Sequence, residues 1–163
     1  MDLFASSAAI PDADVNARSG DADLSQWFTP FWVAEELVDD ALRGLGHVSV
    51  VEPSCGTGAF LSAVPKSLPA FGVDIDPRIV SAAVANSGRE VIVGDFRTTY
   101  LGKRDYQVVI GNPPFEMDVI EGFLDRAHRD LPEDGLIATV LPASAFQTPS
   151  RVPRWRARFS IDA

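Results

Sequence analysis

The most constraining feature of this sequence is a regular alternation of short apolar runs with segments of helical composition. The apolar runs are rich in β-branched residues and occupy positions 48–53, 70–76, 90–95, 106–114 and 135–143. Strands that alternate with helices form βαβ units, which build a mostly parallel sheet with helices on both faces. The sequence therefore predicts a doubly wound α/β fold with five strands and with ligand sites at their carboxyl ends.

Helices are predicted between and before these strands. The segments 58–67, 77–87 and 116–131 are helical in composition or period, whereas 96–104 is predicted to be a loop. A further helix is predicted within residues 30–46, with Thr29 as its N-cap, Pro30 at its first position and Gly44 or Gly46 near its end. Residues 1–24 have no sustained period and are predicted to be a flexible leader.

The composition is that of one soluble domain. Of the 163 residues, 46% are hydrophobic and 23% are charged, which is enough apolar material for a core. No apolar run is long enough to span a membrane, and no basic residue precedes Arg18, so a cytoplasmic location is expected. The single cysteine, Cys55, is interpreted as a small buried residue, and the two histidines do not resemble a metal site.

The charge distribution argues against binding of a polyanion over the whole surface, because the net charge is -9. The one basic cluster lies in residues 147–163. This segment is interpreted either as a solvated basic tail or as a phosphate-contacting segment. Its arginines are Arg151, Arg154, Arg156 and Arg158.

A glycine turn follows the first predicted strand, within residues 52–60. Gly56 and Gly58 remove side chains where a ligand approaches the backbone, although such a turn also serves a plain strand-to-helix connection. Asp74 follows the turn by about twenty residues and is placed to accept hydrogen bonds from both hydroxyls of a ribose. Asp76 is more simply the N-cap of the next helix. Together the turn and Asp74 favour a cofactor that contains adenosine.

Asp95 and Phe96 end the third strand. The Asp95 carboxylate can accept a hydrogen bond from an adenine amino group, and Phe96 can pack on the adenine ring. An aspartate after a strand is also a common loop residue. Its position after two matching strand ends favours the binding role.

The decisive segment is Asn112-Pro113-Pro114-Phe115, after the fourth strand. The prolines stiffen the loop and leave carbonyl acceptors, Asn112 adds a side-chain carbonyl, and Phe115 adds a flat apolar face. The Asn112 side chain and the Pro113 carbonyl can hold both N–H bonds of a planar amine and favour its nucleophilic, pyramidal form. The exocyclic amino group of a nucleobase is such an amine, and a base in a duplex reaches the loop only when it is flipped out of the double helix.

These motifs resemble those of amino-group DNA methyltransferases, which act on N6 of adenine or N4 of cytosine. The matching stretches run from Gln26 to Phe146. The segment Gln26-Trp27-Phe28-Thr29-Pro30 is similar to the N-terminal cofactor motif of the subgroup with a C-terminal recognition domain. The cofactor-binding residues that the resemblance implies are Phe28, Thr29, Pro30, Glu52, Pro53, Ser54, Gly56, Gly58, Asp74, Ile75, Asp95 and Phe96.

The resemblance implies an S-adenosylmethionine-dependent enzyme of the class I methyltransferase fold, with residues 25–146 as the catalytic domain. Asn112, Pro113, Pro114 and Phe115 would hold the target base in DNA, and an Asn before the prolines favours adenine. The family sheet has seven strands, so the last two are expected to be absent, and a partner subunit or a second copy is expected at the open edge. A role in restriction-modification is implied as well.

Three other interpretations stay open. An enzyme that methylates RNA or a protein glutamine would use the same Asn112–Phe115 loop. A catalytically inactive remnant or subunit would bind the cofactor and depend on another chain. A dinucleotide-binding oxidoreductase shares the glycine turn and the acidic strand end but gives no role to Asn112–Phe115.

Overall fold

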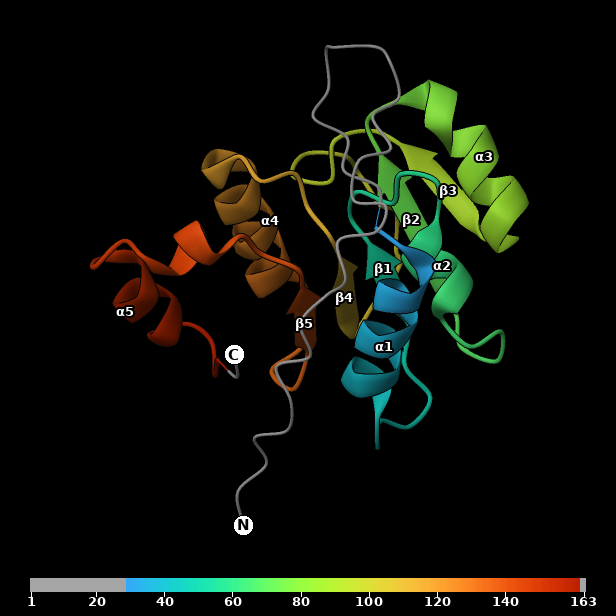
Figure 1. The fold of residues 1–163 in the computed structure, drawn as a ribbon. Helices are drawn as coiled ribbons and strands as arrows, with labels where there is room; N and C mark the ends of the chain where they lie inside the picture. Colours follow the sequence, from blue (N-terminus) through green and yellow to red (C-terminus); the bar gives the residue numbers. More distant parts are fainter. Residues whose placement is uncertain (1–28, 162–163) are drawn as a thin grey trace.

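Five parallel strands form one sheet within residues 29–161, the part of the chain that the computed structural model describes (Figure 1). The strands are β1 (Val50–Glu52), β2 (Ala70–Asp74), β3 (Glu90–Val93), β4 (Val108–Gly111) and β5 (Leu136–Thr139). Their order across the sheet is β3-β2-β1-β4-β5, and each neighbouring pair is parallel. All five predicted strands are confirmed, each shorter than the apolar run that predicted it.

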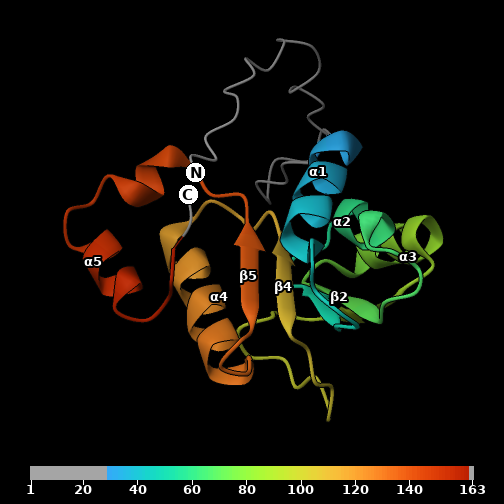
Figure 2. The same ribbon diagram turned by 90° about the horizontal axis from the view of Figure 1, so that it is seen from below.

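Helices connect these strands and cover both faces of the sheet. They are α1 (Phe31–Leu42), α2 (Ala59–Ala63), α3 (Pro77–Ser87), α4 (Met117–Asp130), the 3-10 turn η1 (Ala143–Phe146) and α5 (Arg151–Arg156). Figure 2 shows α1, α2 and α3 together on one side of the sheet and α4 on the other. The predicted flexible leader, residues 1–24, lies outside the described residues. No helix among residues 29–161 is long and apolar enough to cross a membrane.

Alternating side chains of the two central strands build a core on each face. Val50 and Val108 pack on the side of α1 and α2, whereas Val51 and Val109 pack on the side of α4. Successive residues of a strand point to opposite faces, so a strand buried on both sides becomes a continuous apolar run. This burial explains why β1 and β4 are apolar throughout except for Glu52.

The start of α1 differs from the prediction by one residue. Pro30, with φ -55° and ψ 138°, occupies the N-cap, and no side chain caps the helix there. Thr29 is therefore not the N-cap. Its hydroxyl instead accepts a hydrogen bond from the Asn112 side chain, 83 residues away in the sequence. By contrast, Asp76 caps α3 as predicted, since its carboxylate accepts the Arg78 amide hydrogen bond at 2.9 Å.

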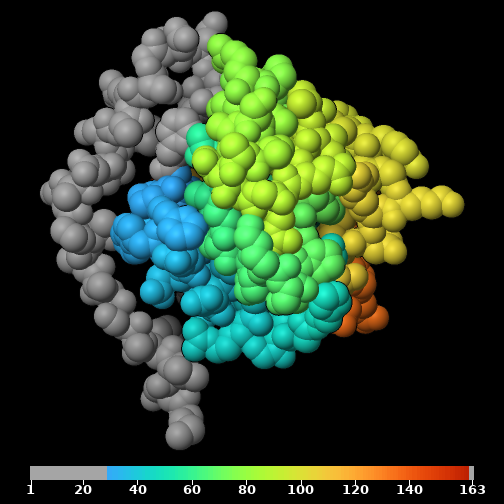
Figure 3. Space-filling model, turned by 90° about the vertical axis from the view of Figure 1, so that its right-hand side faces the viewer, coloured from blue at the N-terminus to red at the C-terminus, as the bar shows by residue number. Residues whose placement is uncertain are grey.

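The helix α2 is shorter than predicted because of Pro65. Val64, its C-cap, has ψ 126°, outside the helical region. A residue that precedes proline avoids the helical conformation, because the proline ring clashes with its backbone. The predicted loop at 96–104 contains no helix or strand and is part of the β3–β4 connection, which projects from the molecule in Figure 3 (yellow).

The segment after β5 packs against α4 and is not a solvated tail, whereas its interpretation as a phosphate-contacting segment stays a prediction. Trp155 is buried, and its indole N–H donates to Glu121 at 3.2 Å. Arg154 also donates to Glu121, at 2.7 Å, and Arg158 donates to Asp125 at 2.6 Å. Both interpretations of the arginine cluster miss these pairs because the acidic partners lie on α4, 33 or more residues earlier in the chain.

Candidate functional site

A cavity of about 280 Å³ lies at the carboxyl ends of β1, β2, β3 and β4. The strand order reverses between β1 and β4, and such a switch point is where open α/β sheets bind ligands. The residues that line the cavity are Pro53, Ser54, Gly56, Asp74, Ile75, Ile79, Gly94, Asp95, Phe96, Arg97, Asn112, Pro113, Pro114, Glu116, Val119 and Phe123.

Gly56 borders the cavity in the turn after β1. Its φ of 51° lies in the left-handed region, and a Cβ built there would meet no atom within 4 Å. Its amide donates to Asp74 Oδ2 at 2.7 Å. The glycine therefore provides the backbone conformation of the turn and leaves open space beside the Asp74 carboxylate.

Gly58, the other predicted glycine, is outside the cavity lining. It is the N-cap of α2 with φ 85°, and a Cβ built there would lie 3.1 Å from the backbone oxygen of Ala83 in α3. The close approach of α2 to α3 requires the absence of a side chain here. The structure gives Gly58 a packing role and no position against a ligand in the cavity.

The Asp74 carboxylate is held by backbone amides. Oδ2 accepts from Gly56, and Oδ1 accepts from the Asp76 amide at 2.9 Å. Each carboxylate oxygen has two lone pairs, so both keep the capacity to accept a further hydrogen bond from a hydroxyl. Ile75, next to it, is 59% exposed and gives the cavity an apolar wall.

Asp95 pairs with a cavity residue that the sequence analysis missed, Arg97. The carboxylate accepts from the Arg97 amide at 2.9 Å and from Nη2 at 2.7 Å, and Nε contacts both oxygens at 3.0 Å. These hydrogen bonds lower the pKa of Asp95, which keeps the carboxyl ionised. Arg97 competes for the same oxygens with any ligand amino group in the cavity.

Phe96 lines the cavity, but its ring is part of the core. The side chain is 1% exposed, its centroid lies 5.4 Å from that of Phe123, and the Arg126 guanidinium stands 5.2 Å from the ring centroid. We expected this ring to pack on an adenine. The structure instead packs it against residues of α4, and the exposed Ile75 gives the cavity an apolar side chain.

Asn112 carries an unsatisfied acceptor. Its side-chain nitrogen donates to Thr29 Oγ1 at 3.2 Å, and its backbone oxygen accepts from Ser54 Oγ at 3.4 Å. Its Oδ1 is buried and has no hydrogen-bond partner. A buried acceptor without a donor costs about 1–3 kcal/mol, so this atom is a ready site for a ligand N–H.

Pro113 and Pro114 line the cavity beside Asn112, as predicted for a single loop. Phe115 is outside the lining and 38% exposed. Its ring is one of the exposed large apolar side chains among the described residues. The loop thus combines carbonyl acceptors at the cavity with an aromatic face available next to it.

Three other predicted residues do not line the cavity, and a fourth lies outside the described residues. Phe28 lies outside the described residues, and Thr29 and Pro30 precede α1. Glu52 is 2% exposed, and one of its carboxylate oxygens accepts from the Leu61 amide at 3.0 Å. Burial raises the pKa of Glu52 well above its usual range, and the charge of Asp74 acts in the same direction.

The sequence analysis missed six of the lining residues. Gly94 precedes Asp95 and Arg97 follows it by two positions, so their place at the strand end was a signal. Val119 and Phe123 lie four positions apart on α4, the spacing of one helix face. The six are Ile79, Gly94, Arg97, Glu116, Val119 and Phe123. Residues 29–161 hold no group of three or more His, Cys, Asp or Glu that could bind a metal ion.

Comparison with solved structures identifies the architecture. The chain is similar to a class I S-adenosylmethionine-dependent methyltransferase from Listeria monocytogenes, with a TM-score of 0.66 and 19% identity over 83% of this chain and 52% of that one. The fold is that of the class I methyltransferases. The predicted doubly wound α/β fold of this type is confirmed, and the cavity lies at the carboxyl ends of the strands of this methyltransferase fold.

Two viral proteins are similar in sequence. The type II methyltransferase M.CvrRI of Paramecium bursaria Chlorella virus XZ-6E is 32% identical over an alignment of 152 residues that covers 81% of this chain. The modification methylase CviBIII of Paramecium bursaria Chlorella virus NC1A is 29% identical over an alignment of 154 residues that covers 77% of this chain. The chain spans 40% of the length of each relative. No protein-family model matches the chain.

Proposed function

We propose that this chain carries the catalytic site of an S-adenosylmethionine-dependent DNA methyltransferase that modifies the exocyclic amino group of a flipped base, N6 of adenine. The observation that carries the proposal is the buried, unpartnered Asn112 Oδ1 in the Asn-Pro-Pro-Phe loop, at the same cavity as Asp74 and Asp95. The names of the two viral relatives support DNA as the substrate and a role in restriction-modification.

The chain's own residues fit the cofactor. Asp74, fixed by two backbone amides, would accept the ribose hydroxyls, and the open space at Gly56 admits a ligand beside it. Ile75 would pack on the adenine ring, and the Asp95 carboxylate would accept a hydrogen bond from the adenine amino group. When bound, S-adenosylmethionine supplies an electrophilic methyl group on its sulfonium.

The Asn112–Phe115 loop would hold the target amine. Asn112 Oδ1 and the Pro113 carbonyl each accept one N–H bond, which directs the nitrogen lone pair away from both acceptors and out of conjugation with the base. Phe115, with its exposed ring, stacks on the flipped base and offsets part of the few kcal/mol that unpairing costs. The reaction needs no covalent bond between enzyme and base.

DNA is held by parts beyond this cavity. Among the described residues, Arg154 and Arg158 form ion pairs with acidic side chains of α4. The net charge of the chain is -9. Phosphate contacts therefore come from another segment, a second copy or a partner subunit. The edge strand β5, whose residues are all only partly buried, is the site where such a chain would pair.

Transfer of a tritiated methyl group from S-adenosylmethionine tests the proposal. Unmodified DNA, total RNA and total protein are offered as acceptors, and Asn112→Ala serves as the inactive control. We expect label in DNA alone, recovered as N6-methyladenine after hydrolysis. Label found in RNA or in protein glutamine would show that this molecule, and not DNA, is the methyl acceptor. Calorimetric binding of NAD in preference to S-adenosylhomocysteine would reject the methyltransferase assignment itself.

A further inference from the structure

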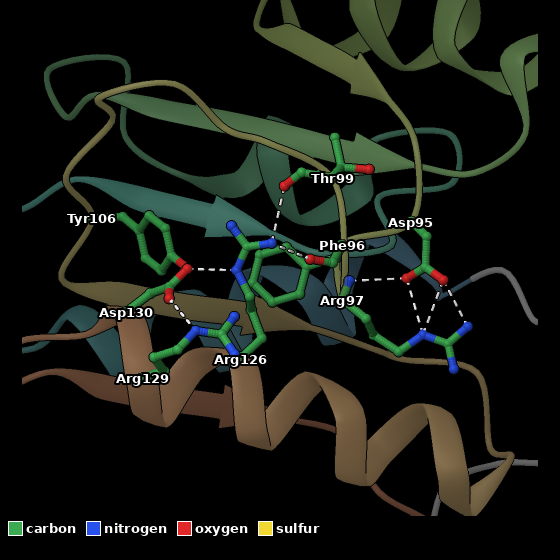
Figure 4. A network of polar contacts seen from close by, with 8 residues as sticks. All are labelled: Asp95, Phe96, Arg97, Thr99, Tyr106, Arg126, Arg129 and Asp130. Atoms are coloured by element: carbon green, nitrogen blue, oxygen red, sulfur yellow. Dashed lines mark hydrogen bonds and ion pairs between the residues drawn. The ribbon is translucent and has the colours of Figure 1, made fainter.

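Arg126 on α4 holds the turn that follows β3, although it does not line the cavity (Figure 4). Its Nη1 donates to two backbone oxygens of that turn, Phe96 O at 2.8 Å and Thr99 O at 2.9 Å. The side chain is only 11% exposed. A buried guanidinium that bonds two carbonyl groups fixes the backbone between them, because each carbonyl loses its donor if the turn moves.

The guanidinium is itself fixed from the opposite side. Its Nε pairs with Asp130, which also accepts from the Tyr106 hydroxyl at 3.2 Å and from Arg129 Nε at 3.1 Å. The Arg126 guanidinium carbon also lies 5.2 Å from the centroid of the Phe96 ring. Figure 4 shows the side chain between Asp130 and the turn. Such an arrangement leaves the guanidinium little freedom to rotate.

The turn that Arg126 holds carries Asp95. The amides of Thr98 and Thr99 donate to the Asp95 backbone oxygen at 3.0 and 2.8 Å, so the Thr99 carbonyl and the Asp95 backbone belong to one hydrogen-bonded unit. Residues 94–97 of this unit line the cavity. The two bonds from Arg126 therefore hold the backbone that carries Asp95, while its carboxylate pairs with Arg97.

We propose that Arg126 is a positioning residue of the cofactor site, which sets the Asp95 carboxylate where it meets the adenine amino group. This inference rests on the function proposed above and names the residue that determines how the site recognises adenine. Arginine suits the role because its planar group donates in several fixed directions at once, to both carbonyls and to Asp130. A lysine keeps the charge and loses this geometry.

Binding of two ligands to the 163-residue chain tests the inference. The ligands are S-adenosylhomocysteine and S-inosylhomocysteine, which carries an oxygen in place of the adenine amino group. The ratio of their dissociation constants measures recognition of this edge of the adenine ring, where the inosine compound has an oxygen in place of the amino group and a hydrogen on N1. A site built to accept the amino group binds the adenine compound more tightly, by about tenfold or more in the parent chain.

The variants are Arg126→Met, Arg126→Lys and Arg129→Met. We expect Arg126→Met to reduce the ratio of the two dissociation constants to about twofold, and Arg126→Lys to reduce it in part. Both variants lose the contacts to the backbone carbonyls, so Asp95 is no longer held in place. Arg129→Met is the matched control, since Arg129 is the neighbouring residue on α4, contacts Asp130 and makes no bond to the turn. It is expected to keep the parent ratio. A purely structural role of Arg126 would weaken both ligands equally and leave the ratio unchanged.

Each outcome decides the question. If Arg126→Met does not give a cooperative melting transition, the ratio of Arg126→Lys is used in the same way. If the parent prefers the adenine compound and both Arg126 variants keep the parent ratio of dissociation constants, the inference about Arg126 is wrong. The proposed function is then unaffected. A parent that binds both ligands equally overturns the assignment of Asp95 and this inference with it. A parent that binds neither overturns the proposed function.

Discussion

The side-chain amide of Asn112 donates a hydrogen bond to Thr29 Oγ1 at 3.2 Å. This contact joins a residue just before α1 to the loop after β4 and places the amide nitrogen of Asn112 toward Thr29. Because the nitrogen is used in this bond, Oδ1 is the atom left without a partner. The contact with Thr29 thereby leaves Asn112 Oδ1 as the acceptor on which the proposed binding of the target amine depends.

Replacement of Thr29 by valine, which has the same shape without a hydroxyl, is expected to lower methyl transfer by about tenfold. The Asn112 amide then loses the bond that orients it, while the cavity keeps its lining. The dissociation constant of S-adenosylhomocysteine should change by less than about twofold. Thr29→Ser retains the hydroxyl and should retain the rate. A Thr29→Val rate equal to that of the parent would show that the amide is oriented by other contacts.

Replacement of Asn112 by alanine should lower methyl transfer by about 100-fold or more, the effect expected when one preorganised polar contact at the reacting atom is lost. Cofactor affinity should stay nearly unchanged, because the change removes no charged group. Single-turnover transfer rates measure the first effect and calorimetry the second. Transfer at the parent rate would disprove the role of Asn112 as the amine acceptor.

Replacement of Asp74 by alanine should weaken binding of S-adenosylmethionine by roughly 1–3 kcal/mol, since a charged acceptor for the ribose hydroxyls is lost. The amides of Gly56 and Asp76 lose their acceptor as well, so the melting temperature should fall. Asp40→Ala, at a residue of α1 that is outside the cavity lining and whose side chain is 79% exposed, is the matched control. An unchanged dissociation constant in a folded Asp74→Ala variant would remove Asp74 from the cofactor site.

Glu52 predicts a pH-dependent stability. Burial raises its pKa in the folded state above the value of 4.5 for the unfolded chain, so the folded protein binds this proton more tightly. The free energy of unfolding therefore loses a contribution as the pH rises from the unfolded pKa toward the folded one, because the unfolded chain releases the Glu52 proton while the folded protein retains it. Glu52→Gln stays neutral and offers an acceptor to the Leu61 amide.

Chemical denaturation without cofactor should find Glu52→Gln more stable than the parent at about pH 8, with the difference largely gone at about pH 4. At the lower pH Glu52 is largely protonated in both states, whereas at the higher pH the unfolded parent carries an ionised Glu52 whose charge burial disfavours. The difference between the two proteins isolates Glu52 from the other carboxyl groups. A difference that is the same at both pH values would mean that Glu52 does not titrate as its burial requires.

The sequence by itself determined the strands, their alternation with helices and hence the edge of the sheet where Asp74, Asp95 and Asn112 meet. Apolar period and strand length are local properties, because each records which faces of one element are buried. The cap at Asp76 is equally local, since donor and acceptor are two residues apart. The ligand roles assigned to these strand ends remain predictions.

The tertiary structure alone decided how the side chains at that edge are used. The Phe96 ring packs into the core, Gly58 lies against Ala83 of another helix, and Arg97 forms an ion pair with the Asp95 carboxylate. The arginines after β5 were ambiguous in the sequence, because their acidic partners lie on α4. Contacts between residues tens of positions apart follow from the packing of whole elements, and no local period records which side chains that packing brings together.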